Sequence, residues 1–257
     1  MLVLVTNDDG VDSPGIVALS EALMTIGDVV VVAPDGDRSG IAHALSIHHP
    51  VRIRERKERR VKTYACSGTP ADCVVVGAYE LCGALPDLVV SGINRGANAG
   101  DDITYSGTIA AANEALLVGI PAIAVSLAVP WPVSDEEPQW DTAAQCTLDL
   151  IEQSAAFGLP DTTLLNLNVP NRHRSALRGL RWTKQARKRY TDRTDRRIDP
   201  RGETYVWIWG SYDGSVIDDD SDLAALRDGY ASVTPITIDR TDEVMLERLR
   251  ERSDNRV

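Results

Sequence analysis

The chain begins with a short apolar run that ends in a pair of carboxylates. Leu2–Thr6 reads LVLVT, and the next four residues are Asn7, Asp8, Asp9 and Gly10. A continuous apolar run of this length is typical of a strand that is buried on both faces of a parallel sheet. Ligands of such sheets bind at the carboxyl ends of the strands. The sequence therefore favours a binding edge at Asp8 and Asp9, where paired carboxylates suit a hard divalent cation. A solvated Asp-Asp-Gly turn is the alternative.

Apolar runs of the same kind alternate with helical patterns further along the chain. The strand pattern recurs at residues 29–33, 88–91, 122–126 and 164–169. Helical patterns fall on residues 14–24, 70–81, 107–118 and 142–157. This alternation predicts an α/β fold with a doubly wound, mostly parallel sheet.

Two segments interrupt this rhythm. Residues 49–64 have a hairpin pattern with one solvated face. A longer hairpin is expected from limbs at residues 181–190 and 203–210 around a charged tip at residues 191–202. Tyr205, Trp207 and Trp209 alternate along its second limb, so that its aromatic face requires a partner such as another subunit.

The expected organisation has three parts. Residues 1–180 form the catalytic core, residues 181–215 form a protruding hairpin arm for oligomerisation, and residues 216–257 return to the core and end in a tail. The tail from Thr241 has the pattern of a capped amphipathic helix that frays at its end.

Composition excludes several classes of partner. The net charge of −11 argues against general binding to nucleic acid or to an anionic membrane. No apolar run approaches the roughly 20 residues that span a bilayer. The four cysteines have no C-x-x-C spacing, and we expect free thiols in a reducing cytoplasm.

Two further loops follow predicted strands and carry neutral oxygen ligands. Ser39 and Asn94 lie in these loops, and with Asp8 and Asp9 they supply two charges and two neutral oxygens. A third carboxylate would repel an incoming phosphate, whereas neutral ligands leave the cation able to attract it. Asn94 is alternatively a turn former in a glycine-rich loop.

A candidate anion site precedes the third predicted helix. Ser106, Gly107 and Thr108 lie where a helix N-terminus presents free backbone N–H groups, and the amide of Asn98 can donate to the same anion. Helix capping is the alternative role of the two hydroxyls. The neighbouring pair Asp101 and Asp102 is expected to form a solvated turn.

Taken together, these motifs resemble the survival protein E (SurE) family of metal-dependent nucleotidases. The matching segments run in the family order over nearly the whole chain. They are VTNDDG, APDGDRSG, SGTPADCV, SGINRGANAGDD, YSGTIAAA, PAIAVS, LNLNVP and DGYASVTPI.

The resemblance implies hydrolysis of nucleoside 5′- and 3′-monophosphates, with one divalent cation, Mg²⁺ or Mn²⁺, in each subunit. It implies a Rossmann-like core and an arm that builds homodimers or homotetramers. The metal ligands of the pattern fall on Asp8, Asp9, Ser39 and Asn94. The phosphate-contacting positions fall on Asn98, Ser106, Gly107 and Thr108, beside Asp8 as a catalytic residue.

The chain departs from the family pattern at Asp37, where the family usually has asparagine, and at residues 183–186, Thr-Lys-Gln-Ala in place of Thr-Arg-Gln-Gly. The extra carboxylate is expected to alter metal preference or the pH optimum. Residues 68–72 either contact the base or cap a helix, and the loop at residues 128–141 is either a lid or plain surface.

Two other functions share an acidic residue after the first strand. A haloacid-dehalogenase-like phosphatase requires Asp-x-Asp, whereas Asp8 and Asp9 are adjacent and Gly10 follows. A non-catalytic receiver-like regulator requires a phosphoacceptor aspartate at the end of the next central strand, where Pro34 and Asp35 fit poorly. For the nucleotidase, attack by water and an aspartyl-phosphate at Asp8 are both compatible with the sequence.

Overall fold

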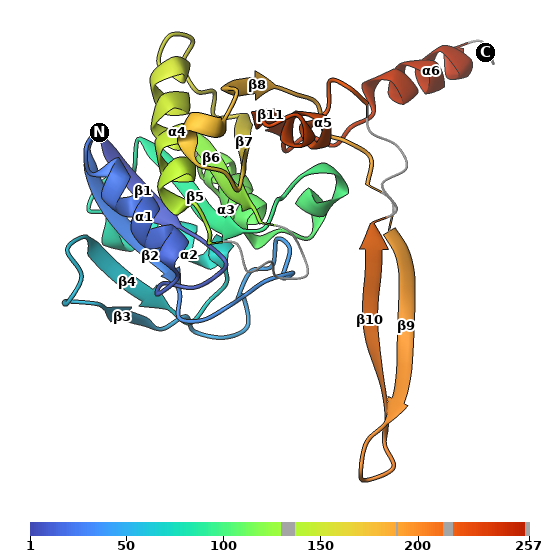
Figure 1. Ribbon diagram of the computed structural model, residues 1–257, viewed down its shortest axis with the longest axis horizontal. Helices are drawn as coiled ribbons and strands as arrows, with labels where there is room; N and C mark the ends of the chain where they lie inside the picture. The colour runs from blue at the N-terminus through green and yellow to red at the C-terminus, as the bar shows by residue number, and fades with distance from the viewer. Residues whose placement is uncertain (130–136, 189, 213–217, 255–257) are drawn as a thin grey trace.

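The computed structural model describes residues 1–129, 137–188, 190–212 and 218–254. Its main sheet has nine strands in the order β3-β4-β2-β1-β5-β6-β7-β11-β8 (Figure 1). The bounds are β1 Leu2–Thr6, β2 Asp28–Pro34, β3 Ile53–Glu55, β4 Lys62–Cys66, β5 Leu88–Arg95, β6 Ala122–Ala128, β7 Thr163–Pro170, β8 Leu180–Trp182 and β11 Ala231–Thr237.

The six strands from β4 to β7 are parallel, which confirms the predicted doubly wound sheet. Numbered among themselves along the chain, they lie in the order 3-2-1-4-5-6 of the Rossmann fold. The order reverses between β1 and β5. Ligands of open α/β sheets bind at this switch point, and the predicted site residues follow these two strands.

Helices cover both faces of the sheet (Figure 1). Helices α1 (Pro14–Leu23) and α4 (Trp140–Ser154) pack on one face, and α2 (Pro70–Val76) and α3 (Gly107–Val118) pack on the other. Successive residues of each central strand face opposite layers. The interior is therefore divided by the sheet into two apolar clusters.

The sheet is completed by antiparallel strands and short helices. Strand β3 pairs antiparallel with β4, as the pattern of residues 49–64 predicts, and β11 pairs antiparallel with β7. The remaining elements of the body are η1 (Gly77–Leu81), η2 (Gly100–Thr104), η3 (Arg174–Ala176) and α5 (Asp222–Arg227). Helix α2 ends before the predicted helix does, and η1 continues it with π-helical geometry.

A separate antiparallel hairpin, β9 (Tyr190–Ile198) and β10 (Thr204–Tyr212), projects from the body (Figure 1). The predicted first limb at residues 181–190 is wrong, because β8 belongs to the main sheet and pairs with β11. Most of the charged segment predicted as the tip is instead strand β9. Its polar residues are compatible with a strand because a ribbon that stands away from the body leaves both faces solvated. Residues 189 and 213–217, near the ends of this arm, lie outside the described part.

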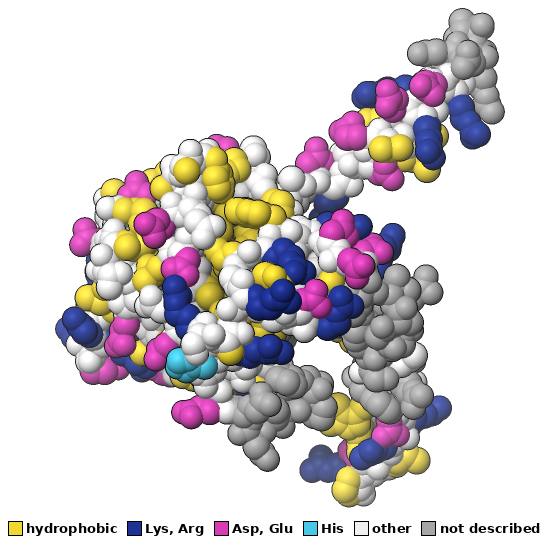
Figure 2. Space-filling model, turned by 45° about the horizontal axis from the view of Figure 1, so that its top comes forward, with side chains coloured by type: hydrophobic (Ala, Val, Ile, Leu, Met, Phe, Trp, Pro, Cys, Tyr) yellow, Lys and Arg dark blue, Asp and Glu magenta, His cyan; other side chains and the backbone are white. Residues whose placement is uncertain are grey.

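The tail contains helix α6 (Glu243–Asp254), which stands away from the body and carries charges of both signs (Figure 2). The Asp242 carboxylate caps it by accepting a hydrogen bond from Met245 N–H at 2.9 Å. Val244, Met245 and Leu249 are exposed. The four cysteines are free. Within the described residues, no helix has the length and apolar character needed to cross a membrane.

We expect Gly15→Ala to destabilise the fold, because α1 lies against the backbone of β5 at this residue. A Cβ at Gly15 would lie 2.2 Å from the carbonyl oxygen of Ile93 and 3.1 Å from the ring of Trp140. Relief requires movement of backbone, so we expect a loss of about 3 kcal/mol in the free energy of unfolding, measured by denaturant titration. Gly36→Ala is the control because a Cβ there meets no atom within 4 Å. Equal stability of the two variants would contradict this close approach.

Candidate functional site

Asp8 follows β1 and is held by the N-terminus of α3. The residue is 3% exposed. Oδ1 accepts a hydrogen bond from the Thr108 hydroxyl at 2.6 Å, and Oδ2 accepts one from Thr108 N–H at 3.1 Å. Helix N-termini favour negative charge. The position predicted to contact phosphate therefore binds Asp8 in the structure, and direct contact of Thr108 with phosphate stays a prediction.

Asp9 lies beside Asp8 and is anchored to the end of β5. Its Oδ2 accepts a hydrogen bond from Arg95 N–H at 3.1 Å. Burial, together with the neighbouring charge of Asp8, raises the pKa of Asp9 to about 6, and burial also raises the pKa of Asp8. Neither carboxylate forms a salt bridge within the described ranges. A buried carboxylate beside a half-buried one, with no salt bridge among the described residues to balance their charge, is a donor set that suits a divalent cation, so the residues fit the predicted metal.

The loop after β2 approaches the same carboxylates. Arg38 N–H donates to the backbone oxygen of Asp8 at 2.8 Å, and the charge of Asp37 contributes to the raised pKa of Asp8. The Ser39 hydroxyl donates to Asp37 Oδ1 at 2.6 Å. Its proton is therefore directed to Asp37, and its oxygen lone pairs remain the donor that a cation would use.

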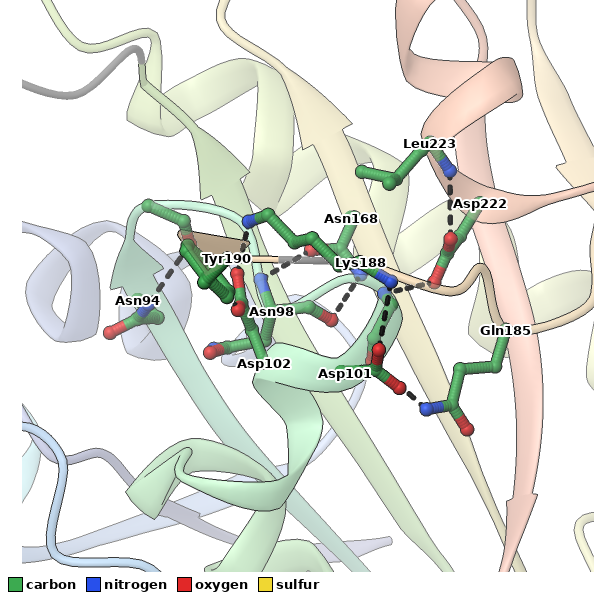
Figure 3. A network of polar contacts seen from close by, with 12 residues as sticks. Asn94, Asn98, Asp101, Asp102, Asn168, Gln185, Lys188, Tyr190, Asp222 and Leu223 are labelled. Carbon is green, nitrogen blue, oxygen red and sulfur yellow. Dashed lines mark hydrogen bonds and ion pairs between the residues drawn. The ribbon is translucent and has the colours of Figure 1, made fainter. Parts of the chain in front are cut away.

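In the described part of the chain, no three His, Cys, Asp or Glu side chains are grouped so as to hold a metal. The predicted cation site therefore depends on Asp8 and Asp9 together with neutral oxygens. Asn94 lies at the end of β5, beyond a register shift against β6 between Ser91 and Asn94. Such irregularities redirect side chains next to functional sites. Asn94 Nδ2 donates to Gly96 O at 2.9 Å, and the amide oxygen points away from that bond (Figure 3).

Asn98 is buried and holds its loop to the sheet. Its N–H donates to Asn168 Oδ1 at 2.8 Å, and its backbone oxygen accepts from Asn166 Nδ2 at 2.8 Å and Asn168 Nδ2 at 3.0 Å. Its own amide donates to Ser126 Oγ at 2.9 Å. These bonds give Asn98 a structural role, and its predicted contact with an anion stays a prediction.

Ser106 caps α3, with its Oγ accepting a hydrogen bond from Ile109 N–H at 3.1 Å. Gly107 follows and lies against Asp8. A Cβ at Gly107 would lie 2.8 Å from Asp8 Cβ and 2.9 Å from Asp8 Oδ2. The absence of a side chain at Gly107 is what allows the helix N-terminus to reach the carboxylate.

Comparison with known proteins supports the resemblance seen in the motifs. A family profile described as Survival protein SurE matches residues 3–192. The 5′-nucleotidase SurE of Syntrophotalea carbinolica is 50% identical over 243 residues, which cover 94% of this chain and 93% of that protein. The chain belongs to the SurE family.

Other SurE proteins extend the comparison. The 5′-nucleotidase SurE of Geobacter sulfurreducens is 46% identical over 250 residues, covering 97% of this chain and 93% of that protein. The crystal structure of the SurE protein from Aquifex aeolicus aligns with a TM-score of 0.82 and 38% identity. That alignment covers 98% of this chain and 100% of the other.

In this SurE chain, the loop that carries Asn94 and Asn98 continues into contacts with the root of the arm (Figure 3). Lys188 N–H donates to Asp101 Oδ2 at 2.8 Å, and Lys188 Nζ forms an ion pair with Asp102. The Tyr190 hydroxyl donates to Asp102 Oδ1 at 2.5 Å. The expected solvated turn at Asp101 and Asp102 is therefore wrong, because the start of the arm covers both carboxylates.

Asp222 completes this network from the N-terminus of α5. The residue is fully buried, and its oxygens accept hydrogen bonds from Gly100 N–H at 2.8 Å and Ala186 N–H at 3.0 Å (Figure 3). One carboxylate thus joins the site loop, the segment before the arm and α5. No pattern in the sequence singles out Asp222, since an aspartate in the first turn of a helix is ordinary.

Residues 68–72, a candidate for base contacts, form the cap of α2. Thr69 Oγ1 accepts from Asp72 N–H at 3.1 Å, and Asp72 Oδ2 accepts from Thr69 N–H at 2.8 Å. This reciprocal pair is a capping box, so the helix-capping alternative describes the segment. Residues 130–136, in the loop considered as a lid, lie outside the described residues.

Proposed function

We propose that the chain is a metal-dependent phosphatase that hydrolyses nucleoside 5′-monophosphates, and also 3′-monophosphates, to nucleoside and phosphate. The observation that carries this proposal is the adjacent pair of buried Asp8 and half-buried Asp9 at the switch point of the sheet. The names of the SurE relatives as 5′-nucleotidases support it.

In this proposal, one Mg²⁺ or Mn²⁺ per subunit is held by Asp8, Asp9, Ser39 and Asn94. Such a cation polarises a phosphoryl oxygen and lowers the pKa of bound water. Ser106 and Gly107 offer a hydroxyl and a backbone N–H to the phosphoryl oxygens at the N-terminus of α3.

We propose attack by water rather than by Asp8. Both oxygens of Asp8 already accept hydrogen bonds from Thr108. To act as the nucleophile, Asp8 would have to break these hydrogen bonds. A carboxylate that keeps them can still orient an attacking water molecule. Trapping of a phosphoenzyme by rapid quench would overturn this part of the proposal.

The decisive experiment is phosphate release from a panel of nucleoside 5′- and 3′-monophosphates with Mn²⁺, with Mg²⁺ and with chelator. Release that requires metal supports the nucleotidase and ranks its substrates. No release from any ester with either metal would reject it. The haloacid-dehalogenase and receiver alternatives are not retained, because the chain belongs to the SurE family.

The arm supports a proposal about assembly. Tyr205 and Trp207 lie on one face of β10, Val206 and Ile208 lie on the other, and all are exposed, Ile208 to 83%. A hairpin with apolar side chains on both faces requires a partner. We propose that it joins subunits into a homodimer or homotetramer in the cytoplasm.

We expect the double variant Trp207→Ser, Ile208→Ser to shift the assembly toward monomer, because it removes apolar contact area from both faces of the arm. Light scattering after size exclusion measures the mass. Thr194→Ala is the control, since Thr194 is exposed and lies opposite Ile208 in the hairpin register. An unchanged mass in the double variant would show that the arm does not hold the subunits together.

A further inference from the structure

A cavity of about 630 Å³ opens beside Asp9, one of the candidate metal ligands. Its lining includes Asp9, Asp12, Asp35, Arg95 and Trp140. Cavities of about 300–1,000 Å³ are typical of small-molecule sites. Because Asp9 borders it directly, a molecule whose phosphate lies at the carboxylate pair can extend into this space.

Trp140 gives the cavity an aromatic wall. It begins α4, and its ring packs over Gly15 in α1, where a Cβ would lie 3.1 Å from the ring. The side chain also packs against the apolar cluster that contains residues of α1 and α4, and it is partly buried. A ring held in this way presents a preformed surface on which a planar base can stack.

Among the described residues, the charged lining consists of three carboxylates, Asp9, Asp12 and Asp35, and one cation, Arg95, so it favours a neutral group over a second phosphate. Asp12 is engaged by Arg59 at 2.6 Å, and Asp35 is engaged by Arg38 at 3.1 Å. These carboxylates accept hydrogen bonds and repel anions. Ribose hydroxyls and exocyclic amino groups are the donors that a nucleoside would offer them.

A second cavity, of about 580 Å³, is lined by a different set of residues. It is lined by residues of α3, β11 and the segment before the arm, including Leu117 and Ile236. None of the predicted metal ligands or phosphate contacts lines it. The two cavities are similar in size, so volume does not choose between them. We assign the nucleoside to the first cavity because Asp9 lines it.

We propose that the cavity between Asp9 and Trp140 receives the nucleoside of the substrate, with the base stacked on the Trp140 ring. This inference rests on the proposed nucleotidase activity and names the part of the site that recognises the base. In this proposal Trp140 determines which substrates bind, because it contacts the base and not the reacting phosphoryl group.

The test compares two substrates with the same phosphate ester chemistry, adenosine 5′-monophosphate and ribose 5-phosphate, in the metal-loaded enzyme. Trp140→Ala is expected to raise KM for the nucleotide by about tenfold or more. KM for ribose 5-phosphate and kcat for both substrates should change little. Trp140→Phe should keep most of the nucleotide affinity, and Leu117→Ala, in the other cavity, should match wild type.

Binding of adenosine itself, measured by calorimetry, separates this inference from the proposed activity. Loss of adenosine binding in Trp140→Ala supports the inference even if no ester is hydrolysed. Unchanged KM and adenosine affinity in Trp140→Ala would overturn it while leaving the nucleotidase intact. A rise in KM for the nucleotide in Leu117→Ala alone would move the nucleoside to the other cavity and also overturn it.

Discussion

Asp8→Asn is expected to lower phosphate release from nucleoside monophosphates by at least about 1,000-fold, because it removes a charge from the proposed cation site. The side chain keeps its shape. The asparagine can rotate so that its oxygen accepts from Thr108 N–H while its amide donates to the Thr108 hydroxyl. The expected loss is therefore one of charge rather than of local structure. Steady-state release of phosphate with saturating Mn²⁺ measures it.

The same substitution has an expected effect on stability that does not depend on turnover. Burial raises the pKa of Asp8, which means that the ionised carboxylate is held at a cost in the metal-free protein. Without metal, Asp8→Asn should unfold at the same temperature as wild type or at a higher one. Added Mn²⁺ should raise the unfolding temperature of wild type, by mass action, and should raise that of the variant much less.

Asp149→Asn is the matched control, since Asp149 forms a surface ion pair with Arg174 at 2.8 Å and lies outside the site. It should retain wild-type turnover and the wild-type response to Mn²⁺. Wild-type activity in Asp8→Asn would remove Asp8 from the mechanism. A full shift in unfolding temperature with Mn²⁺ would remove it from the cation site.

Much of the fold follows from local patterns that the sequence displays directly. Strand β1 and helix α3 have the predicted bounds, because a continuous apolar run and a Ser-capped helix ending before Gly119 are unambiguous local signals. The first limb of the arm is not predicted correctly. Strand β9 is polar on both faces, because the arm is solvated, and it therefore lacks the alternation of apolar residues that indicates a strand. Pairing of β8 with β11 joins segments far apart in the sequence, and no local pattern reports it.

The sequence predicts which loops form the candidate site, but not which hydrogen bonds its side chains make. The switch point brings Asp8, Asp9 and Asn94 to one edge, as a parallel sheet requires. The sequence does not reveal that Thr108 would bind Asp8, because a hydroxyl at a helix start serves equally as a cap, a phosphate contact or a carboxylate donor. Asp222 and Trp140 have ordinary positions in their helices, and only the folded chain shows what each faces.

Gly107→Ala is the second substitution with a large expected effect, and it tests position rather than charge. The added Cβ would lie 2.8 Å from Asp8 Cβ, so either the start of α3 or the end of β1 must move. Displacement of a reacting constellation by about 1 Å can cost 100-fold in rate. We expect a loss of kcat of about that size, measured with the best nucleotide of the panel.

Stability and activity should respond differently to this change. Alanine favours a helix over glycine by up to about 1 kcal/mol, so propensity alone would make Gly107→Ala more stable than wild type. The clash of the new Cβ with Asp8 opposes this gain. The measured change in unfolding free energy is the gain from helix propensity minus the cost of the clash. Gly210→Ala is the control, since a Cβ there meets its nearest atom at an ordinary 3.5 Å. A Gly107→Ala enzyme with both higher stability and full kcat would show that α3 and Asp8 do not need this contact, and the fixed orientation of Asp8 would lose its proposed role in catalysis.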